Sequence, residues 1–251
     1  MRVSFLIAAA VLLAACDTAT APRSMQSSVD DSRLPADLRA AYFDDASRLA
    51  LRDLVATGFR EIRIPQEAVQ PYYNALVSVY NAAALPARDT VVDVYRIHTF
   101  ALPATRSLYL VVGLNEVWAH RLTHDSLPTG NILVDRLVTD FALSVDIVDT
   151  LFTGDLLIVL RSAEPLNMAA LAPQFRQASG VHSANPDTRI GDGNDIGGER
   201  DDATRLAYSV GYGDCPAGCI ARRFYHFAIH DDGTVEYLGA SGSPPPQPGS
   251  P

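Results

Sequence analysis

The most constraining feature of this 251-residue chain is a nine-residue block, Gly211 to Cys219, that lies between two strand-like stretches. An extended chain would hold Cys215 and Cys219 too far apart for a disulfide, so the chain must fold back between them, and Pro216 and Gly218 permit such a turn. The block therefore predicts a β-hairpin pinned by a Cys215–Cys219 bridge, worth on the order of 2 kcal/mol in the loop-entropy model. Apolar residues recur at every second position in both flanks: Leu206, Tyr208, Val210 and Tyr212, then Tyr225, Phe227 and Ile229.

The rest of the last quarter extends this hairpin. An Asp-Gly pair at 232–233 predicts a tight turn and residues 235–238 a third strand, so 191–240 should form a loop and a disulfide-pinned meander of three strands. Residues 187–202 have no apolar period and many turn formers, which predicts a loop. The final segment, 241–251, is rich in proline, glycine and serine and predicts a disordered tail.

The amino-terminal segment has the pattern of a secretory signal. Arg2 precedes an apolar run that ends in Leu-Ala-Ala-Cys and is too short to span a bilayer as a mature helix. Residues 1–16 resemble the signal and lipobox of bacterial lipoproteins. The resemblance implies cleavage before Cys16, acylation of that cysteine, palmitate included, and a membrane tether outside the cytoplasm, periplasmic or surface-exposed. A plain secretory signal with an incidental cysteine is the alternative. Residues 17–33 predict a flexible tether.

The cysteine count indicates the compartment of the protein, and its net charge excludes some classes of partner. The chain has 3 cysteines, and acylation of Cys16 would leave Cys215 and Cys219 as an even pair, as expected in an oxidising space. The formal net charge of −9 argues against nucleic acid or an anionic membrane surface as a partner, because both call for concentrated positive charge. No motif calls for a cofactor, and none is expected.

Residues 34–105 predict a helical front end followed by a strand. An imperfect apolar stripe predicts a helix over 34–55 that ends at Gly58. Pro65 suits the first turn of a second helix, and residues 91–97 predict a strand. The apolar side chains of the second helix fall on one face, as is typical of a core-facing helix: Val69, Tyr72, Tyr73, Leu76, Val77 and Tyr80.

Residues 106–190 contain a weak internal repeat of strand, helix and strand. The first copy comprises 108–113, a helix capped by Asn131, and 143–148; the second comprises 156–160, a helix capped by Asn167, and a strand near Ala184. The resulting order, βαββαβ, is that of ferredoxin-like domains. The fold class expected for the chain is therefore α+β, with amino-terminal helices, a ferredoxin-like unit and a carboxy-terminal antiparallel meander.

Two resemblances follow from these segments. The second copy, with its Gly180-Val181 and Asn185-Pro186 pairs, looks like the same segment in the inhibitory propeptides of subtilisin-type proteases, which supports the ferredoxin-like fold. The hairpin resembles that of uncharacterised bacterial envelope lipoproteins with a Gly-aromatic-Gly-Asp-Cys-Pro-x-Gly-Cys motif. This second resemblance extends over most of the mature chain and implies no activity. The motif residues here are Gly211, Tyr212, Gly213, Asp214, Cys215, Pro216, Ala217, Gly218 and Cys219.

The cysteine pair has a second interpretation. Cys-Pro-Ala-Gly-Cys shares its spacing and proline with the copper-binding, thioredoxin-like Sco assembly proteins, and thiolates select Cu(I). Pairs of that kind normally sit between a strand and a helix whose amino terminus lowers the thiol pKa, whereas both flanks here are strand-like. A structural disulfide is favoured, and redox or copper chemistry at Cys215 and Cys219 stays open as the alternative.

Three further clusters contain candidate metal-binding or polar site residues. Glu116, His120 and His124 recur every four residues, so a helix would align them as weak candidate zinc ligands, although the His-Glu-x-x-His order is absent. The alternative for that segment is a surface or partly buried element anchored by Trp118. The other two clusters are an acidic loop with possible calcium ligands and a polar strand face: Asp187, Asp192, Asn194 and Asp195, and Arg222, Phe224, His226 and His230. The acidic loop lacks the ligand spacing of helix-loop-helix calcium sites, so a solvated loop is favoured.

No nucleophile-elbow serine, phosphate-binding glycine loop or paired carboxylates are found in the sequence. The expected function is therefore that of a non-catalytic envelope lipoprotein that binds a protein or peptide partner, with a propeptide-like protease inhibitor as one specific version. A thiol–copper or disulfide-exchange protein is the main alternative, and a metal-dependent hydrolase around His120 and His124 is a third.

Overall fold

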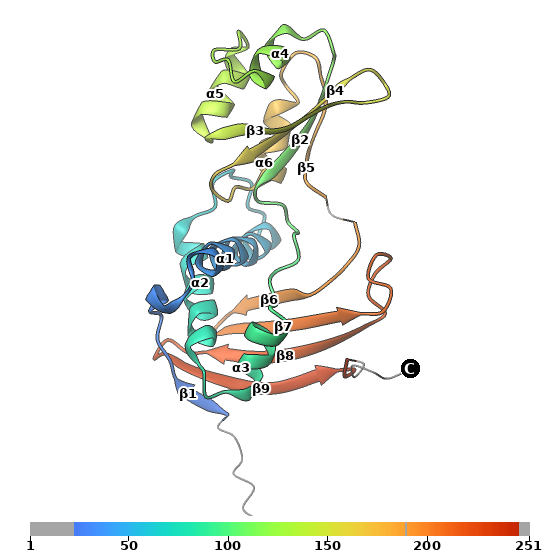
Figure 1. The fold of residues 1–251 in the computed structure, drawn as a ribbon. Helices are drawn as coiled ribbons and strands as arrows, with labels where there is room; N and C mark the ends of the chain where they lie inside the picture. Colours follow the sequence, from blue (N-terminus) through green and yellow to red (C-terminus); the bar gives the residue numbers. More distant parts are fainter. Residues whose placement is uncertain (1–22, 189, 246–251) are drawn as a thin grey trace, which may run out of the picture.

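The computed structural model describes residues 23–188 and 190–245, which form two lobes stacked end to end (Figure 1). Lobe 1 combines the two ends of the described chain, 23–105 and 190–245, and lobe 2 is the middle segment, 106–188. The chain therefore crosses between the lobes twice. Each lobe has one antiparallel sheet, so the α+β class predicted from the sequence is confirmed. The signal segment and Cys16 lie outside the described residues.

Lobe 1 contains a five-stranded sheet in the order β1-β9-β8-β7-β6. The predicted meander forms its middle, and all neighbours are antiparallel. The strands are β1 (Ser24–Gln26), β6 (Asp195–Arg200), β7 (Thr204–Tyr212), β8 (Ala221–Ile229) and β9 (Thr234–Gly242). Three predictions were wrong in extent, because β1 lies within the expected tether, β6 lies within the expected loop, and β9 ends at Gly242, inside the expected disordered tail 241–251.

Both additional strands form for tertiary reasons that local sequence does not carry. In β6, Gly197-Gly198 has little strand propensity, but the chain there pairs with β7 along its length. A Cβ at Gly198 would lie 2.6 Å from Cε1 of Tyr72 and 3.2 Å from Cδ2 of Leu49, so the glycine allows two helices to pack closely on the strand. β1 exists because the edge of β9 offers it backbone partners.

Helices cover one face of this sheet. They are α1 (Ala36–Ala56), α2 (Gln66–Asn81), α3 (Pro86–Asp89) and a π-helical turn, η2 (Thr90–Val94), with a short 3₁₀ turn, η1 (Asp31–Arg33), before α1. The expected strand at 91–97 was wrong. Pro86 starts a helix that continues as η2, and Val91 becomes fully buried against the core of lobe 1. The β-branched run that suggested a strand is thus helical, with Val91 buried and Val94 70% exposed.

Lobe 2 has a four-stranded sheet in the order β3-β4-β2-β5, again antiparallel throughout. This order is that of a split βαββαβ unit, so the ferredoxin-like arrangement is confirmed. Asn131 and Asn167 cap two of its helices through their side-chain oxygens, as predicted. The elements are β2 (Ser107–Val112), α4 (Val117–Thr123), α5 (Ile132–Asp140), β3 (Leu143–Thr150), β4 (Leu156–Ser162), α6 (Met168–Phe175) and β5 (Val181–Pro186).

The two lobes have separate hydrophobic cores and meet through polar contacts and through Ile62, which belongs to lobe 1 and packs against the core of lobe 2. Arg106 Nη2 donates to Asp44 Oδ1 at 2.5 Å, and the backbone amide of Asn167 donates to the Ile62 carbonyl at 2.8 Å. Arg63 and Leu166 form an isolated bridge beside this contact. Within the described ranges, no helix is both long and apolar enough to cross a bilayer.

Candidate functional site

The disulfide hairpin is the first candidate, and the structure forms it as predicted. Cys215 and Cys219 are bonded across the turn between β7 and β8. A Cβ at Gly211 would lie 2.4 Å from Cys219 Sγ, so the sulfur occupies the space that a side chain would need. Gly213 and Gly218 have φ values of 93° and 112°, which favour glycine. These contacts explain why the motif needs glycines at these positions.

The remaining motif residues also have structural roles. The Tyr212 hydroxyl donates to the Ser243 and Pro244 carbonyls at 2.9 and 3.0 Å, which holds the end of the described chain against β7. The Asp214 carbonyl accepts from the Ala217 amide at 3.1 Å inside the turn, and Pro216 is exposed there. Apart from the exposed Pro216, each motif residue therefore either shapes the turn or ties it to a neighbour.

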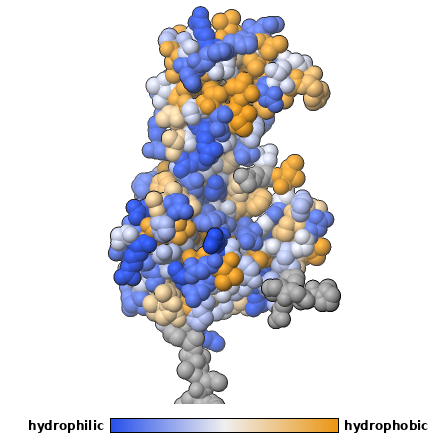
Figure 2. Space-filling view, viewed as in Figure 1, coloured by the Kyte–Doolittle hydropathy of each residue, from blue (hydrophilic) through white to orange (hydrophobic). Residues whose placement is uncertain are grey.

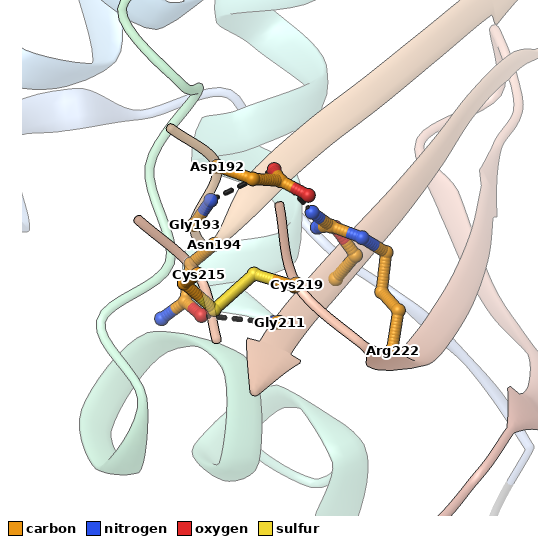
Figure 3. The surroundings of a disulfide bond; sticks show 8 residues. Asp192, Gly193, Asn194, Gly211, Cys215, Cys219 and Arg222 are labelled. Carbon is orange, nitrogen blue, oxygen red and sulfur yellow. Dashed lines mark hydrogen bonds and ion pairs between the residues drawn. A yellow bond between two sulfur atoms is a disulfide. The ribbon is translucent and has the colours of Figure 1, made fainter. Parts of the chain in front are cut away.

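The hairpin turn also holds the second connection between the lobes, described over 190–194 (Figure 3). The Asp192 amide donates to the Cys215 carbonyl at 2.8 Å, and Arg222 Nη2 donates to Asp192 Oδ1 at 2.5 Å. Asn194 Oδ1 accepts from the Gly211 amide at 3.2 Å. The Arg222 guanidinium, aided by the Gly193 amide, lowers the pKa of Asp192. We call this arrangement of residues 190–194, 211–219 and 222 the clasp.

The clasp geometry bears on the proposed metal and redox roles. Both flanks of the cysteines are strands, β7 and β8, and not the strand and helix that normally flank a redox or copper pair of this spacing. The calcium candidates diverge, because Asp192 bonds Arg222, Asn194 bonds Gly211 and Asp195 bonds Arg52. Over residues 23–188 and 190–245, no group of three or more His, Cys, Asp or Glu side chains could hold a metal ion. The acidic loop is a structural connection.

The candidate zinc ligands do not come together. Glu116 is the residue before α4, while His120 Nε2 lies 2.6 Å from the Leu114 carbonyl and His124 Nδ1 lies 2.7 Å from the His120 carbonyl. The imidazoles are therefore used in local backbone contacts. Trp118 is buried and donates from Nε1 to the Ser179 carbonyl at 2.9 Å, so the interpretation of an anchored segment fits.

The polar face of β8 is also explained by local pairing. His226 stacks on Phe224 with ring centroids 6.0 Å apart and lies 2.8 Å from the Ser241 hydroxyl through Nε2. His230 Nε2 lies 3.8 Å from a carboxylate oxygen of Glu236. Arg223 donates to the Gly242 carbonyl at 2.9 Å. These residues stabilise the pairing of β8 with β9.

Sequence reasoning missed a buried polar cluster in which Asp45 and Arg48 of α1 contact His98 and Thr99. We call it the acidic cluster after its central residue, Asp45. Asp45 is 1% exposed, and its Oδ1 accepts from the Thr99 amide at 2.9 Å and from the Thr99 hydroxyl at 2.6 Å. Its Oδ2 lies 2.6 Å from Nδ1 of His98, a bond that raises the pKa of His98 against the opposing effect of burial. Arg48 Nη1 donates to the Thr99 hydroxyl at 3.2 Å. A signal was present, because Asp45 interrupts the apolar stripe between Tyr42 and Ala46.

This cluster holds the first connection between the lobes, 95–106, against α1. Arg52 then joins the two connections: it donates to the Leu102 carbonyl at 2.8 Å and pairs with Asp195 at 3.0 Å. The Phe100 amide donates to the same carboxylate at 2.6 Å. Both connections are therefore fixed to lobe 1, one by the acidic cluster and one by the clasp.

The last candidate is the face of the lobe 2 sheet that the helices leave open. Its strands place apolar side chains there that belong to neither core: Tyr109 and Val111 on β2, Ile147 on β3, and Leu157 and Val159 on β4. Figure 2 shows hydrophobic surface gathered over these strands. The register aligns Tyr109, Val159 and Ile147 in one row that ends at β3.

The row ends at a free sheet edge. Among the described residues, β3 pairs with β4 alone, so its outer side has unpaired backbone groups. Ile147 and Val148 are 51% and 44% exposed on this strand, and Phe152 is fully exposed in the turn that follows. An apolar face and an open edge meet at Ile147.

Comparisons with known proteins add no relative: no family model matches the chain, and searches of curated proteins and of solved structures found no match.

Proposed function

We propose that this protein is a lipid-anchored envelope protein that binds a polypeptide partner through the open face and the free β3 edge of lobe 2. The observation that supports this most directly is that Ile147, 51% exposed at the end of the row Tyr109, Val159 and Ile147, sets apolar surface beside unpaired backbone groups, while Val159 in the middle of the row is only 2% exposed. Peptide N–H and C=O groups at a sheet edge are satisfied by another extended backbone, and an apolar face adjoining them supplies contact area.

The tether length supports an orientation in which lobe 2 is presented to partners. Seven residue steps separate Cys16 from Arg23, where the described chain begins, and at full extension they reach about 25 Å. Figure 1 shows β1 at the end of lobe 1 that faces away from lobe 2. An acyl chain on Cys16 would hold that end of lobe 1 close to the bilayer and leave lobe 2 pointing away.

The proposal is tested by site-specific photo-crosslinking in cell envelopes. A photoreactive side chain at Tyr109 is expected to yield a discrete adduct with a protein, and the second substitution Val111→Asp should abolish the adduct by placing a charge on the face. The matched control puts the same side chain at Leu238, which is 49% exposed on lobe 1. Equal adducts from both positions, or none from Tyr109, would contradict the proposal.

A protease inhibitor of the propeptide type is the specific version to test first. The confirmed ferredoxin-like order and the segment from Gly180 to Pro186 favour it. The purified protein should slow at least one subtilisin-type serine protease at micromolar concentration, and Val111→Asp should relieve the inhibition. If no protease of a broad panel is slowed, this version fails, while binding to other polypeptides is judged by the crosslinking result.

A further inference from the structure

We infer that a second site in lobe 2, between α4 and α5, binds a zwitterionic dipeptide of apolar residues. A cavity of about 650 Å³ lies there, within the range of roughly 300–1,000 Å³ that is typical of small-molecule sites. Figure 1 shows these helices at the end of lobe 2 that faces away from lobe 1. None of the described residues that line the cavity belongs to β2, β3 or β4, so the inference is independent of the proposed function.

Two opposite charges line this cavity without pairing. Glu116 is the residue before α4, and Arg121 lies within that helix. Over the described part of the chain, neither side chain forms an ion pair with the other or with a third group, and Arg121 donates only from Nη1, at 3.3 Å to the Thr129 carbonyl. A ligand with an ammonium group at one end and a carboxylate at the other would pair with both charges.

The Glu116 carboxylate is positioned by the backbone beside it. A Cβ at Gly180 would overlap Cδ and Oε1 of Glu116, so the side chain occupies space that only a glycine leaves free. The neighbouring Ser179 is fixed to α4, because its carbonyl accepts from Trp118 Nε1 at 2.9 Å. The acceptor for an ammonium group is therefore held in place before a ligand binds, which lowers the entropy cost of binding.

Apolar side chains lie at the rim of the same cavity. Val117 is 64% exposed and Ile132 is 86% exposed, and they are the first residues of α4 and α5. Covering them with apolar groups of a ligand would remove both side chains from water. A dipeptide carries two side chains between its charged ends, whereas a single amino acid carries one. The charges and the rim together fit a dipeptide of apolar residues.

Calorimetric titration of the purified protein with the dipeptide Leu-Leu tests the inference. Trp118, the one tryptophan of the chain, lines the cavity, so its fluorescence reports where the ligand binds. Leu-Leu should bind and change this emission. N-acetyl-Leu-Leu lacks the ammonium group and Leu-Leu amide lacks the carboxylate, so each should bind about threefold more weakly, as expected for the loss of one partly exposed ion pair. Gly-Gly, which lacks apolar side chains, should also bind more weakly.

Matched variants assign each end of the ligand. Glu116→Gln should remove the preference for Leu-Leu over its N-acetyl form, and Arg121→Gln should remove the preference over the amide. Glu67→Gln and Arg136→Gln change exposed residues outside the cavity and should keep both preferences. The inference is overturned if Leu-Leu does not bind, if all four ligands bind equally, or if the preferences survive in the two cavity variants. Equal binding of Leu-Leu and its N-acetyl form would indicate a simple anion site at Arg121 and would also overturn it.

Discussion

The two sheets of this molecule differ in the residues on their helix-free faces and in the contacts at their edges. In lobe 1, the side that faces away from the helices mixes Arg205, His226 and Ser209 with two large apolar side chains, Phe224 and Leu238. Arg52 caps the β6 edge by donating to the Ile196 carbonyl at 2.7 Å. In lobe 2, the corresponding face is apolar and the β3 edge is unpaired among the described residues. Lobe 2 therefore has an apolar face and a β3 edge that the described residues leave uncovered, as the proposed binding role requires.

The contrast extends to stability, because the buried polar contacts that fix the connections all belong to lobe 1. The acidic cluster around Asp45 and the clasp around Cys215 both hold segments that lead to lobe 2. Damage to them should loosen lobe 1 and the connections while lobe 2 keeps its own core. Hydrogen exchange measured separately for each lobe therefore tests this difference in stability.

The largest effect is expected from Asp45→Ala. The change removes the acceptor for the Thr99 amide and hydroxyl and leaves Arg48 buried without its carboxylate, which should cost about 3 kcal/mol of unfolding free energy. Urea unfolding measures this loss. Amides of residues 95–106 should lose protection, and those of β2 and β4 should not. Asp37→Ala, on the exposed start of the same helix, is the control. Equal loss of protection in both lobes would show that the lobes unfold as one unit.

Removal of the disulfide ranks second. The double substitution Cys215→Ser and Cys219→Ser should cost about 2 kcal/mol in the loop-entropy model and should raise exchange at residues 190–194. Ala217→Ser, at an exposed position inside the same turn, is the control for mutation nearby. If the double variant instead leaves stability and exchange unchanged but abolishes a thiol-dependent reaction or Cu(I) binding of the reduced protein, the hairpin is a reactive site and its structural role is rejected.

A smaller effect should appear with pH. The hydrogen bond to Asp45 raises the pKa of His98 above its unfolded value of about 6.5. Its stabilisation is therefore fully present below about pH 6.5 and is lost as pH rises through the folded pKa. Because the His98 side chain is 39% exposed, the change should stay within about 1 kcal/mol. The unfolding free energy of the wild type minus that of His98→Gln should fall as the pH is raised. The same difference between the wild type and His226→Gln is the control. A difference that grows with pH would contradict the assignment.

Sequence periodicity predicted the elements that bury one face by themselves. The stripe of α2, the Asn131 and Asn167 caps and the hairpin glycines were all readable, since each depends on neighbours within a few residues. The elements that were missed depend on distant partners: β6 forms against β7 despite its glycines, and Val91 is buried within a helical turn. The Asp45 cluster joins residues more than fifty positions apart, so only the lone acidic residue in an apolar stripe could have signalled it. The fold class was thus predictable, whereas the contacts between segments were not.

The two faces of the lobe 2 sheet should differ at adjacent positions, and the variant on the open face should give the smallest effect of all. Val111 and Val112 are neighbours on β2, but Val112 is fully buried in the core and Val111 belongs to neither core. Replacing valine by threonine keeps the branched shape and adds a hydroxyl. Val112→Thr should cost about 1–3 kcal/mol because that hydroxyl is buried without a partner. Val111→Thr should change the unfolding free energy by less than about 0.5 kcal/mol, since its hydroxyl can reach water. The two values come from urea unfolding under one condition. Equal costs would mean that the face around Val111 is already covered, and lobe 2 would then be as closed as lobe 1.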